Sequence, residues 1–461
     1  MSLVIVADDL SGAADCAIGF ANPARRTVVA LDPTRPVTGE NAVIAVDTDT
    51  RRLAPADAAR RALQAWRTFG APGWRLYKKI DSTLRGNWAA EVAALQPLAG
   101  LAIVAPAFPE TGRTVRDGRV YVQGVPLHET GIWQLDHAGR NADLQPMLQA
   151  ACLCTRHVDV DALRRGPPAL ARMIAGCAAN GIDALVVDAQ TSADLQTLAQ
   201  ATLEAETALF WVGSGGLARE LAMLPKLFDT EATGKPSAQS VQSAQSAQLR
   251  AVAGAAPAAR DGAILVLVGS LSDVSARQCT VLRERAGIAT LTVPPAILRA
   301  SAEPHERTAW QAAIGARLSN REDLLLRIGR DDAFDPAEGA RFSTALASLV
   351  APHVAHLAGL IATGGETVRA MLDAAGVVGL EMRSEIEPGV ALSVPTDTDT
   401  DTGMRRFAIV TKAGGFGNEH TLYNAWRYLH GRRASPGKLV NESPNPIRSE
   451  PSAAISSHEQ R

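Results

Sequence analysis

The chain has 461 residues, 46 % hydrophobic and 20 % charged, which is ordinary for globular proteins and excludes a wholly disordered chain. Its 46 basic and 48 acidic residues nearly cancel and only 4 % of its residues are aromatic, so charge and base stacking both argue against nucleic-acid binding. Lysine is rare among the basic residues, so each position where it occurs is of interest. The lysines are Lys78, Lys79, Lys226, Lys235, Lys412 and Lys438.

The N-terminus has no basic segment before its apolar run and reaches two acidic residues by position 9, so we expect no signal peptide. The longest apolar stretches, such as residues 98–108, are too short to cross a membrane and contain proline. Five cysteines are too few and too scattered for a disulfide framework. We therefore expect a cytoplasmic protein with no membrane partner.

Short β-branched runs alternate along the chain with segments of helical period, such as residues 55–68 and 193–206. Strands that are apolar on both faces and alternate with helices indicate parallel sheets. The sequence thus predicts an α/β fold of two domains, each with a largely parallel sheet flanked by helices and with the active site in the cleft between them. The predicted strands are 2–7, 27–32, 42–48, 100–106, 184–189, 208–213, 263–269, 289–293, 323–329, 359–364 and 407–412.

A Ser/Ala/Gln-rich stretch separates the two sets of strands and has too little apolar surface to repay its ordering entropy. We predict an N-terminal domain over 1–228, a low-complexity linker or insertion over 229–261, a C-terminal domain over 262–431 and a flexible tail over 432–461. The acidic run 395–403 is interpreted as a solvated loop. The alternative, a metal site of Asp397, Asp399 and Asp401, is disfavoured by their even spacing.

Ligands of open parallel sheets bind beyond the carboxyl ends of the strands. Asp8 and Asp9 follow the first predicted strand, where they could bind a hydroxyl or a metal, or where Asp9 or Ser11 could simply cap a helix. Arg51 follows the third strand and could grip a carboxylate through its guanidinium fork, or be an ordinary surface charge.

Residues 77–87 combine three cations, an acid, two hydroxyls and an amide just before a helical pattern. This is an inventory for binding an anion or a polyol at a helix N-terminus, although a solvated charged face is the simpler alternative. The candidate ligands here are Lys79, Asp81, Ser82, Thr83 and Arg85.

Three predicted strands of the C-terminal half end in loops that contain glycine or serine, and paired glycines let backbone N–H groups approach phosphate oxygens. Each loop alone could be a tight turn, but the three together favour a nucleotide site. No Walker A sequence is present. The candidates for nucleotide binding are Ser270, Gly364, Gly365, Glu366, Thr367, Lys412, Gly414 and Gly415.

Other motifs are weaker. Residues 210–218 match a dinucleotide fingerprint, but the acidic residue expected about 20 positions later would fall in the linker, so we interpret this loop as a helix turn or a contact at the domain junction. Cys152, Cys154 and His157 lack a fourth ligand at zinc spacing. We interpret His353 and His356 as ordinary helix residues.

Taken together, the motifs resemble the four-carbon acid sugar kinase family, whose members phosphorylate threonate, erythronate or 3-oxo-tetronate with ATP. They are in family order from residue 7 to about 417, and KKIDST is more similar to the D-threonate kinases than to the 3-oxo-tetronate kinases. The segments 229–261 and 395–403 depart from the family, but neither lies in a motif. The motifs are ADDLSGA (7–13), DTDTR (47–51), KIDSTLRGN (79–87), APAFPETGRTV (105–115), GVPLHET (124–130), TGGET (363–367) and KAGGFG (412–417).

The resemblance implies a sugar-acid site of Asp8 or Asp9, Arg51 and residues 79–83 in the N-terminal domain. It implies an ATP site of Ser270, residues 364–367 and Gly414 in the C-terminal domain, with Mg²⁺ accompanying ATP. D-threonate phosphorylated at O4 is the expected reaction, with 3-oxo-tetronate or D-erythronate as alternative substrates. Domain closure about the linker would exclude water.

We expect the substrate hydroxyl to be oriented by Asp81 or Asp9, and the developing charge to be offset by Lys79, Arg85 or Lys412. The sequence leaves open which aspartate is the base and which groups bind Mg²⁺. A non-catalytic sugar-acid sensor and an NAD-dependent dehydrogenase are the alternatives from other classes, and a homodimer is an alternative to a monomer.

Overall fold

The computed structural model describes residues 2–22, 25–131, 133–134, 141–228, 261–331, 335, 338–396 and 407–434. Nearly all of the predicted linker, the predicted tail beyond residue 434 and Asp397, Asp399 and Asp401 lie outside these ranges. The domain boundaries predicted at 228 and 262 flank the undescribed segment and stay a prediction. No helix among the described residues is long and apolar enough to span a bilayer.

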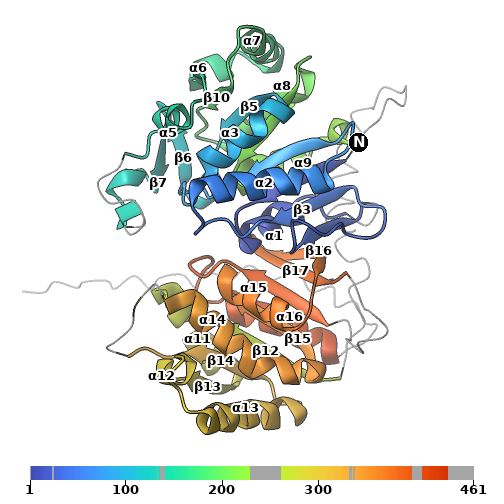
Figure 1. Cartoon of the computed structure of the whole chain (residues 1–461), viewed down its shortest axis with the longest axis vertical. Coiled ribbons are helices and arrows are strands. Elements are labelled where there is room, and N and C mark those ends of the chain that lie inside the picture. Colours follow the sequence, from blue (N-terminus) through green and yellow to red (C-terminus); the bar gives the residue numbers. More distant parts are fainter. Residues whose placement is uncertain are drawn as a thin grey trace, which may run out of the picture.

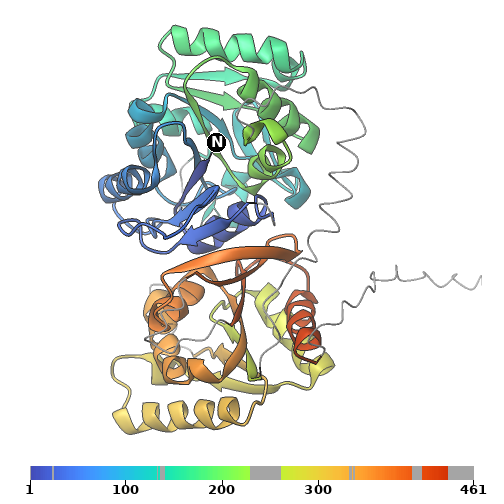
Figure 2. The same ribbon diagram turned by 90° about the vertical axis from the view of Figure 1, so that its right-hand side faces the viewer.

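The N-terminal half forms a parallel sheet in the order β2-β3-β1-β4-β11-β5-β10-β9, with helices on both faces (Figures 1 and 2). The strands are β1 (Leu3–Ala7), β2 (Thr27–Ala30), β3 (Val43–Asp47), β4 (Arg75–Lys79), β5 (Leu101–Ala105), β9 (Thr155–Val158), β10 (Ala184–Val187) and β11 (Leu209–Gly213). The helices are α1 (Leu10–Ile18), α2 (Pro55–Phe69), α3 (Trp88–Ala99), α5 (Leu144–Ala150), α6 (Val160–Leu163), α7 (Pro167–Ala179), α8 (Ser192–Glu204) and α9 (Gly215–Ala222).

The C-terminal half continues with the parallel strands β13-β14-β12-β15-β18, followed by the antiparallel hairpin β17-β16. The strands are β12 (Ala263–Val268), β13 (Ala289–Val293), β14 (Leu324–Ile328), β15 (Leu357–Thr363), β16 (Gly379–Glu387), β17 (Val390–Pro395) and β18 (Ala408–Lys412). The helices are α11 (Asp273–Ala286), α12 (Pro295–Leu298), α13 (Pro304–Ser319), α14 (Gly339–Val350), α15 (Gly365–Ala374) and α16 (Thr421–Ala434).

The two predicted sheets are joined into one sheet of 15 strands. Strand β16 pairs antiparallel with β2 through the partners Gly379–Ala30, Leu380–Val29 and Glu381–Val28. The β16–β17 hairpin therefore lies at the junction of the two halves, directly below β3 and α1 in Figure 1. The predicted α/β class with two mostly parallel sheets is confirmed, and this pairing adds a continuity that the strand pattern did not predict.

All eleven predicted strands are present, with ends that differ by one or two residues. The main sheet also contains β4, β9, β16 and β17, which were not predicted. A separate three-stranded antiparallel sheet of β6 (Arg113–Arg116), β7 (Arg119–Val122) and β8 (Val125–Pro126) follows β5. The central strands β1, β3, β5 and β12 are buried along their whole length, so the core lies on both faces of the sheet.

Candidate active site

A cavity of about 470 Å³ lies between the two halves, at the carboxyl ends of the N-terminal strands. Its N-terminal wall is formed by residues that follow β1, β3, β4, β5 and β11, and its C-terminal wall by the hairpin turn at Gly389 and the loop after β18. Strand ends thus bring together side chains that are far apart in the sequence. Of the predicted sugar-acid residues, Asp9, Arg51, Lys79, Asp81, Ser82, Thr83 and Arg85 line this cavity.

Asp8 does not line the cavity but lies beneath Arg51. The Arg51 Nε and Nη2 atoms donate to the two Asp8 carboxylate oxygens at 2.9 and 3.1 Å, and the Asp8 residue is 2 % exposed. Burial opposes ionisation of Asp8, but Arg51 and Lys78 together hold its pKa below the ordinary value. Asp8 is therefore placed to fix Arg51 rather than to touch a ligand.

Asp9 has the helix-capping role considered from the sequence and also contacts Arg51. Its Oδ1 accepts from the Gly12 backbone N–H at 3.0 Å, so it caps α1, and the same oxygen lies 3.0 Å from Arg51 Nη2. A β-carbon on Gly12 would lie 2.6 Å from Asp9 Oδ1 and 2.9 Å from Lys79 Nζ, so only glycine lets the two side chains approach here. No hydrogen bond to Asp9 Oδ2 is found within the described part of the chain.

The unengaged oxygen of Asp9 faces the C-terminal half. A β-carbon built on Gly365, the first residue of α15, would lie 3.2 Å from Asp9 Oδ2 and 3.2 Å from Ser11 Oγ. The start of α15 therefore meets the end of β1 across the junction. Because the first N–H groups of a helix have no partner within it, this is a place where phosphate oxygens are stabilised.

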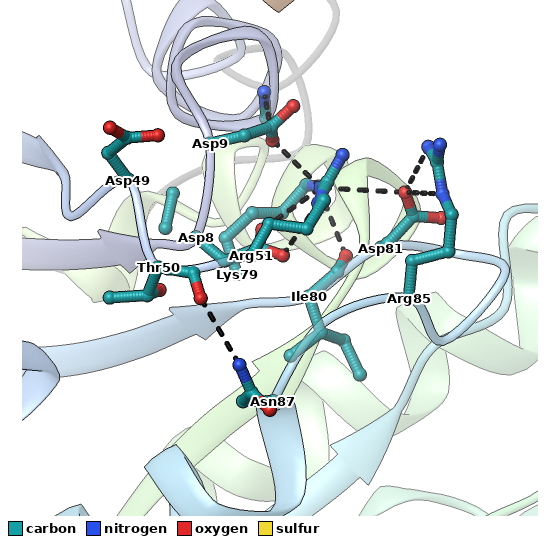
Figure 3. Close-up of polar contacts among 12 residues, drawn as sticks. Asp8, Asp9, Asp49, Thr50, Arg51, Lys79, Ile80, Asp81, Arg85 and Asn87 are labelled. Atoms are coloured by element: carbon teal, nitrogen blue, oxygen red, sulfur yellow. Dashed lines mark hydrogen bonds and ion pairs between the residues drawn. The ribbon is translucent and has the colours of Figure 1, made fainter. Parts of the chain in front are cut away.

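Both carboxylate oxygens of Asp81 accept hydrogen bonds. Its Oδ1 accepts from the Thr83 backbone N–H at 2.7 Å and from Thr83 Oγ1 at 2.6 Å, and its Oδ2 accepts from Arg85. Arg51 Nη2 lies 3.5 Å from Asp81 Oδ2, so Arg51 lies between Asp9 and the Asp81–Arg85 pair (Figure 3). Burial opposes ionisation, but Arg85, Arg51 and Lys79 hold the pKa of Asp81 far below its ordinary value.

The two neighbouring lysines of β4 point to opposite faces of the sheet, as successive strand residues must. Lys79 lines the cavity and donates to the Ile80 carbonyl at 3.0 Å. Burial lowers the pKa of Lys79, but Asp9 and the other acidic groups around it together outweigh burial and raise the pKa. Lys78 is fully buried and its Nζ lies 2.7 Å from Glu91 Oε2. The prediction that both lysines belong to one cluster of ligand-binding cations is therefore wrong for Lys78, which forms a buried ion pair in the core.

The three glycine- or serine-containing loops of the C-terminal half converge because β12, β15 and β18 are neighbours in the sheet. A β-carbon on Gly414 would lie 2.6 Å from Ser270 Oγ and 3.8 Å from the Gly364 Cα atom, so the loops touch and Gly414 has no room for a side chain. The Ser275 hydroxyl donates to the Gly414 carbonyl at 2.8 Å and fixes the third loop on α11.

Several side chains of these loops are already engaged. Lys412 is 2 % exposed and its Nζ donates to the carbonyls of Ala413 at 2.8 Å and Gly414 at 3.1 Å, while burial lowers its pKa to about 8. Glu366 Oε1 lies 2.6 Å from Arg52 Nη2 of the other half. Thr367 shares a buried hydrogen bond with Ser343 at 3.0 Å. The backbone N–H groups of Gly365, Glu366 and Thr367, which open α15 and have no partner within the helix, are better placed than these side chains to bind a ligand.

The sequence did not single out several residues that line the cavity. Arg113 and Phe108 follow β5, and Ser214 and Gly215 follow β11, so the strand-end rule that found Asp9 and Arg51 could have found them too. Gly389 had no such signal, because it lies in the turn of an unpredicted hairpin. The cavity residues that were not named as ligand candidates, although most of them lie in the quoted motifs, are Ser11, Gly12, Asp15, Phe108, Thr111, Arg113, Ser214, Gly215, Gly389, Ala413 and Phe416.

Comparison with known proteins agrees with the two halves of this site. A family model described as a sugar-binding N-terminal domain matches residues 3–221, and one described as a nucleotide-binding C-terminal domain matches residues 265–422. A D-threonate kinase of Cupriavidus necator is 50 % identical over 94 % of this chain and 99 % of its own length. The chain belongs to the four-carbon acid sugar kinase family.

Other members are more distant. A D-threonate kinase of Bordetella bronchiseptica is 34 % identical over 93 % of this chain and 98 % of its own, and a 3-oxo-tetronate kinase of Burkholderia multivorans is 28 % identical over 92 % and 97 %. A solved structure from Salmonella typhimurium has a TM-score of 0.74 at 22 % identity and covers 93 % of this chain and 99 % of that chain, so the two chains share a fold.

Proposed function

We propose that this protein transfers the γ-phosphoryl group of ATP to O4 of a four-carbon sugar acid, and that its substrate is D-threonate. The observation that supports this reaction is the closeness of Asp9 to the start of α15, because an unengaged carboxylate oxygen lies there beside a helix N-terminus, a feature that commonly binds phosphate. The substrate assignment is supported by the similarity to D-threonate kinases.

Asp9 is the better candidate for the base that accepts the hydroxyl proton. Both hydrogen-bonding contacts of Asp9 go to Oδ1, which leaves Oδ2 to accept the proton as O4 bonds to phosphorus and the bond from phosphorus to the leaving oxygen breaks. Asp81 is a poor base, because Thr83 and Arg85 both donate hydrogen bonds to its carboxylate, Arg51 lies close to it, and its pKa is strongly lowered.

The remaining groups position the substrates and neutralise their negative charge. Lys79 stays protonated beside Asp9 and can stabilise the transferred phosphoryl group, while the backbone N–H groups of Gly365, Glu366 and Thr367 in the first turn of α15 can hold the other phosphates. Side-chain contacts from Lys412 and Thr367 to ATP stay a prediction, which would require both side chains to leave their present partners.

Mg²⁺ would supply charge neutralisation on the phosphates. The described residues contain no group of three or more potential metal ligands, which fits an ion that is held mainly by phosphate oxygens and water. Among the cavity residues, Asp9 and Asp15 are the carboxylates with an oxygen that has no hydrogen-bond partner within the described chain, and they are the candidates to contact it.

An ADP-release assay across D- and L-threonate, D- and L-erythronate and 3-oxo-tetronates tests this function. D-threonate should give the highest kcat/KM, with phosphorus NMR locating the new ester at O4. A preference for D-erythronate or a 3-oxo-tetronate would support the proposed kinase activity but contradict the proposed substrate. Binding of these acids without ADP release would favour a sensor, and no response to any of them would refute the proposal.

A further inference from the structure

Arg51 was predicted to grip the carboxylate of the substrate, but its charge is already matched. Its guanidinium contacts Asp8 at 2.9 Å, Asp9 at 3.0 Å and Asp81 at 3.5 Å. Three carboxylates around one cation leave no net positive charge for a fourth. A sugar acid needs a cation elsewhere in the cavity, because an anion transferred from water to an uncompensated site loses its hydration energy.

Arg113, at the start of β6, lines the same cavity and has no acidic partner among the residues that the structure describes. Its Nη1 donates to the Thr111 carbonyl at 2.7 Å, its buried Nε has no hydrogen-bond partner, and no carboxylate of the described chain lies within 4.0 Å of it. Arg85 also lines the cavity and shares Asp81 with Arg51. This end of the cavity therefore holds more positive than negative charge.

The electrostatics of Arg113 agree with its geometry. Burial lowers the pKa of Arg113, Asp81 opposes the shift, and the like charge of Arg85 adds to it. The guanidinium groups of Arg113 and Arg85 repel each other, and an anion bound to both would offset that repulsion. Apart from Asp81, the described chain places no carboxylate beside these two arginines.

We propose that Arg113, together with Arg85, binds the carboxylate of the sugar acid and so fixes which end of the substrate is phosphorylated. Arg51 lies between this cationic end and Asp9, so a substrate that places its carboxylate at Arg113 directs its other end towards Asp9 and the start of α15. This inference rests on the proposed kinase function and explains why O4, the atom farthest from the carboxylate, would react.

The test compares Arg113→Gln, Arg113→Lys and a matched control, Arg116→Gln. Arg116 lies on the same strand, but its side chain is 58 % exposed and stacks over Tyr121. D-threonate binding is measured by calorimetry without ATP, and kcat and KM by ADP release. We expect Arg113→Gln to weaken binding and raise KM roughly 10- to 100-fold with a much smaller change in kcat, and Arg113→Lys to restore part of the loss. Arg116→Gln should behave as the wild type.

Threitol, in which CH₂OH replaces the carboxylate, separates recognition from folding. Its affinity and any turnover should be weak and nearly the same in the wild type and in Arg113→Gln, because the lost contact is absent from both. Equal losses for D-threonate and threitol, or a D-threonate affinity within threefold of the Arg116→Gln value, would overturn the inference. Wild-type binding without ADP release would refute the kinase function while leaving the carboxylate site testable by binding alone.

Discussion

At the scale of single residues, the candidate site is a chain of alternating charges in which each group limits what its neighbour can do. Arg51 is neutralised by Asp8, Asp9 and Asp81, and Asp81 is fixed by Thr83 and Arg85. The two carboxylates that the sequence could not tell apart are therefore unequal. Asp81 is bonded through both of its oxygens and holds its neighbours in place, whereas Asp9 has one oxygen without a hydrogen-bond partner among the described residues.

This difference predicts the effect of Asp9→Asn. The amide cannot accept the hydroxyl proton but can still cap α1 through its oxygen, so kcat should fall by about 10²- to 10⁴-fold while the Tm stays within a few degrees of the wild type. Steady-state ADP release and thermal unfolding measure the two quantities.

Asp49→Asn is the matched control, because Asp49 is exposed in the same region and asparagine tolerates its left-handed backbone (φ 48°). It should leave kcat unchanged. If Asp9→Asn kept near-normal turnover while Asp81→Asn lost it, the base would be Asp81, and if both kept it, neither carboxylate would be the base.

At the scale of elements, the loop that carries Arg51 is fixed from below by a buried ion pair between β4 and α3. Lys78 and Glu91 are both fully buried, and Glu91 Oε1 also accepts from Thr50 Oγ1 at 2.5 Å. Asn87 donates to the Thr50 and Leu53 carbonyls at 3.2 and 2.8 Å. A core contact thus sets the position of a cavity residue.

Glu91→Ala should therefore be strongly destabilising. It leaves the Lys78 ammonium buried without a partner, so the free energy of unfolding, measured in urea, should fall by about 3–5 kcal/mol. The double variant Lys78→Met with Glu91→Leu should recover most of the loss, because it removes both charges and keeps the volume.

An exposed ion pair provides the control. Asp57 and Arg60 are 48 % and 75 % exposed on α2, so Asp57→Ala should cost no more than about 0.5 kcal/mol. Equal costs for Glu91→Ala and Asp57→Ala, or a double variant no more stable than Glu91→Ala, would contradict the assigned role of the buried pair.

Elements with a clear local pattern were predictable and those defined by distant partners were not. The central strands are apolar on both faces, so β1, β5 and β12 were evident from the sequence. Strand β4 carries two lysines in five residues and resembles a loop until Glu91 supplies a partner for one of them. The hairpin β16–β17 has polar residues on β16, and its pairing with β2 depends on residues in the other half of the chain.

The candidate site likewise combines residues that local sequence predicted with contacts that only the three-dimensional structure reveals. Strand ends predicted most of the ligands on the N-terminal wall, because chain order alone identifies the residues that come directly after a strand. Which charges cancel could not be predicted, since the pairing of Asp8 with Arg51 and the lack of an acidic partner for Arg113 among the described residues depend on three-dimensional distances. Arg113 was present in a recognised motif, yet nothing local distinguished it from its neighbours.

At the scale of the whole molecule, ion pairs and strand pairing connect the two halves. Arg369 on α15 lies 2.6 Å from Asp47 at the end of β3, and Arg219 on α9 lies 2.6 Å from Glu385 on β16. The expected closure about the linker would therefore have to bend the sheet at β2–β16 or shift these contacts, because the halves are not joined by a linker alone.

The burial of Asp47 makes the free energy of unfolding depend on pH. Burial raises the pKa of Asp47 to about 7 although Arg369 is close, whereas its ordinary value is 3.8. Between these values the folded carboxyl holds a proton that the unfolded one releases, so the free energy of unfolding should fall as pH rises, by up to about 1.4 kcal/mol per pH unit. Asp47→Asn should remove this contribution between pH 5 and 7 in urea titrations.

Asp373→Asn is the control, since Asp373 is 55 % exposed and contacts the same Arg369 at 3.1 Å. Its free energy of unfolding should fall with pH as steeply as that of the wild type. A wild-type slope in Asp47→Asn would show that this carboxyl is ionised throughout the range, and a steeper loss in Asp47→Asn would reverse the sign of the effect.

The pairing of β2 with β16 also determines what happens if the halves are separated. A fragment that ends before residue 262 would leave the backbone N–H and C=O groups of β2 without partners along one edge, and the complementary fragment would leave the same groups open on β16. Such edges recruit strands from other molecules. Each half produced alone would therefore tend to self-associate, and mixing the two fragments should suppress that association by restoring the native neighbour.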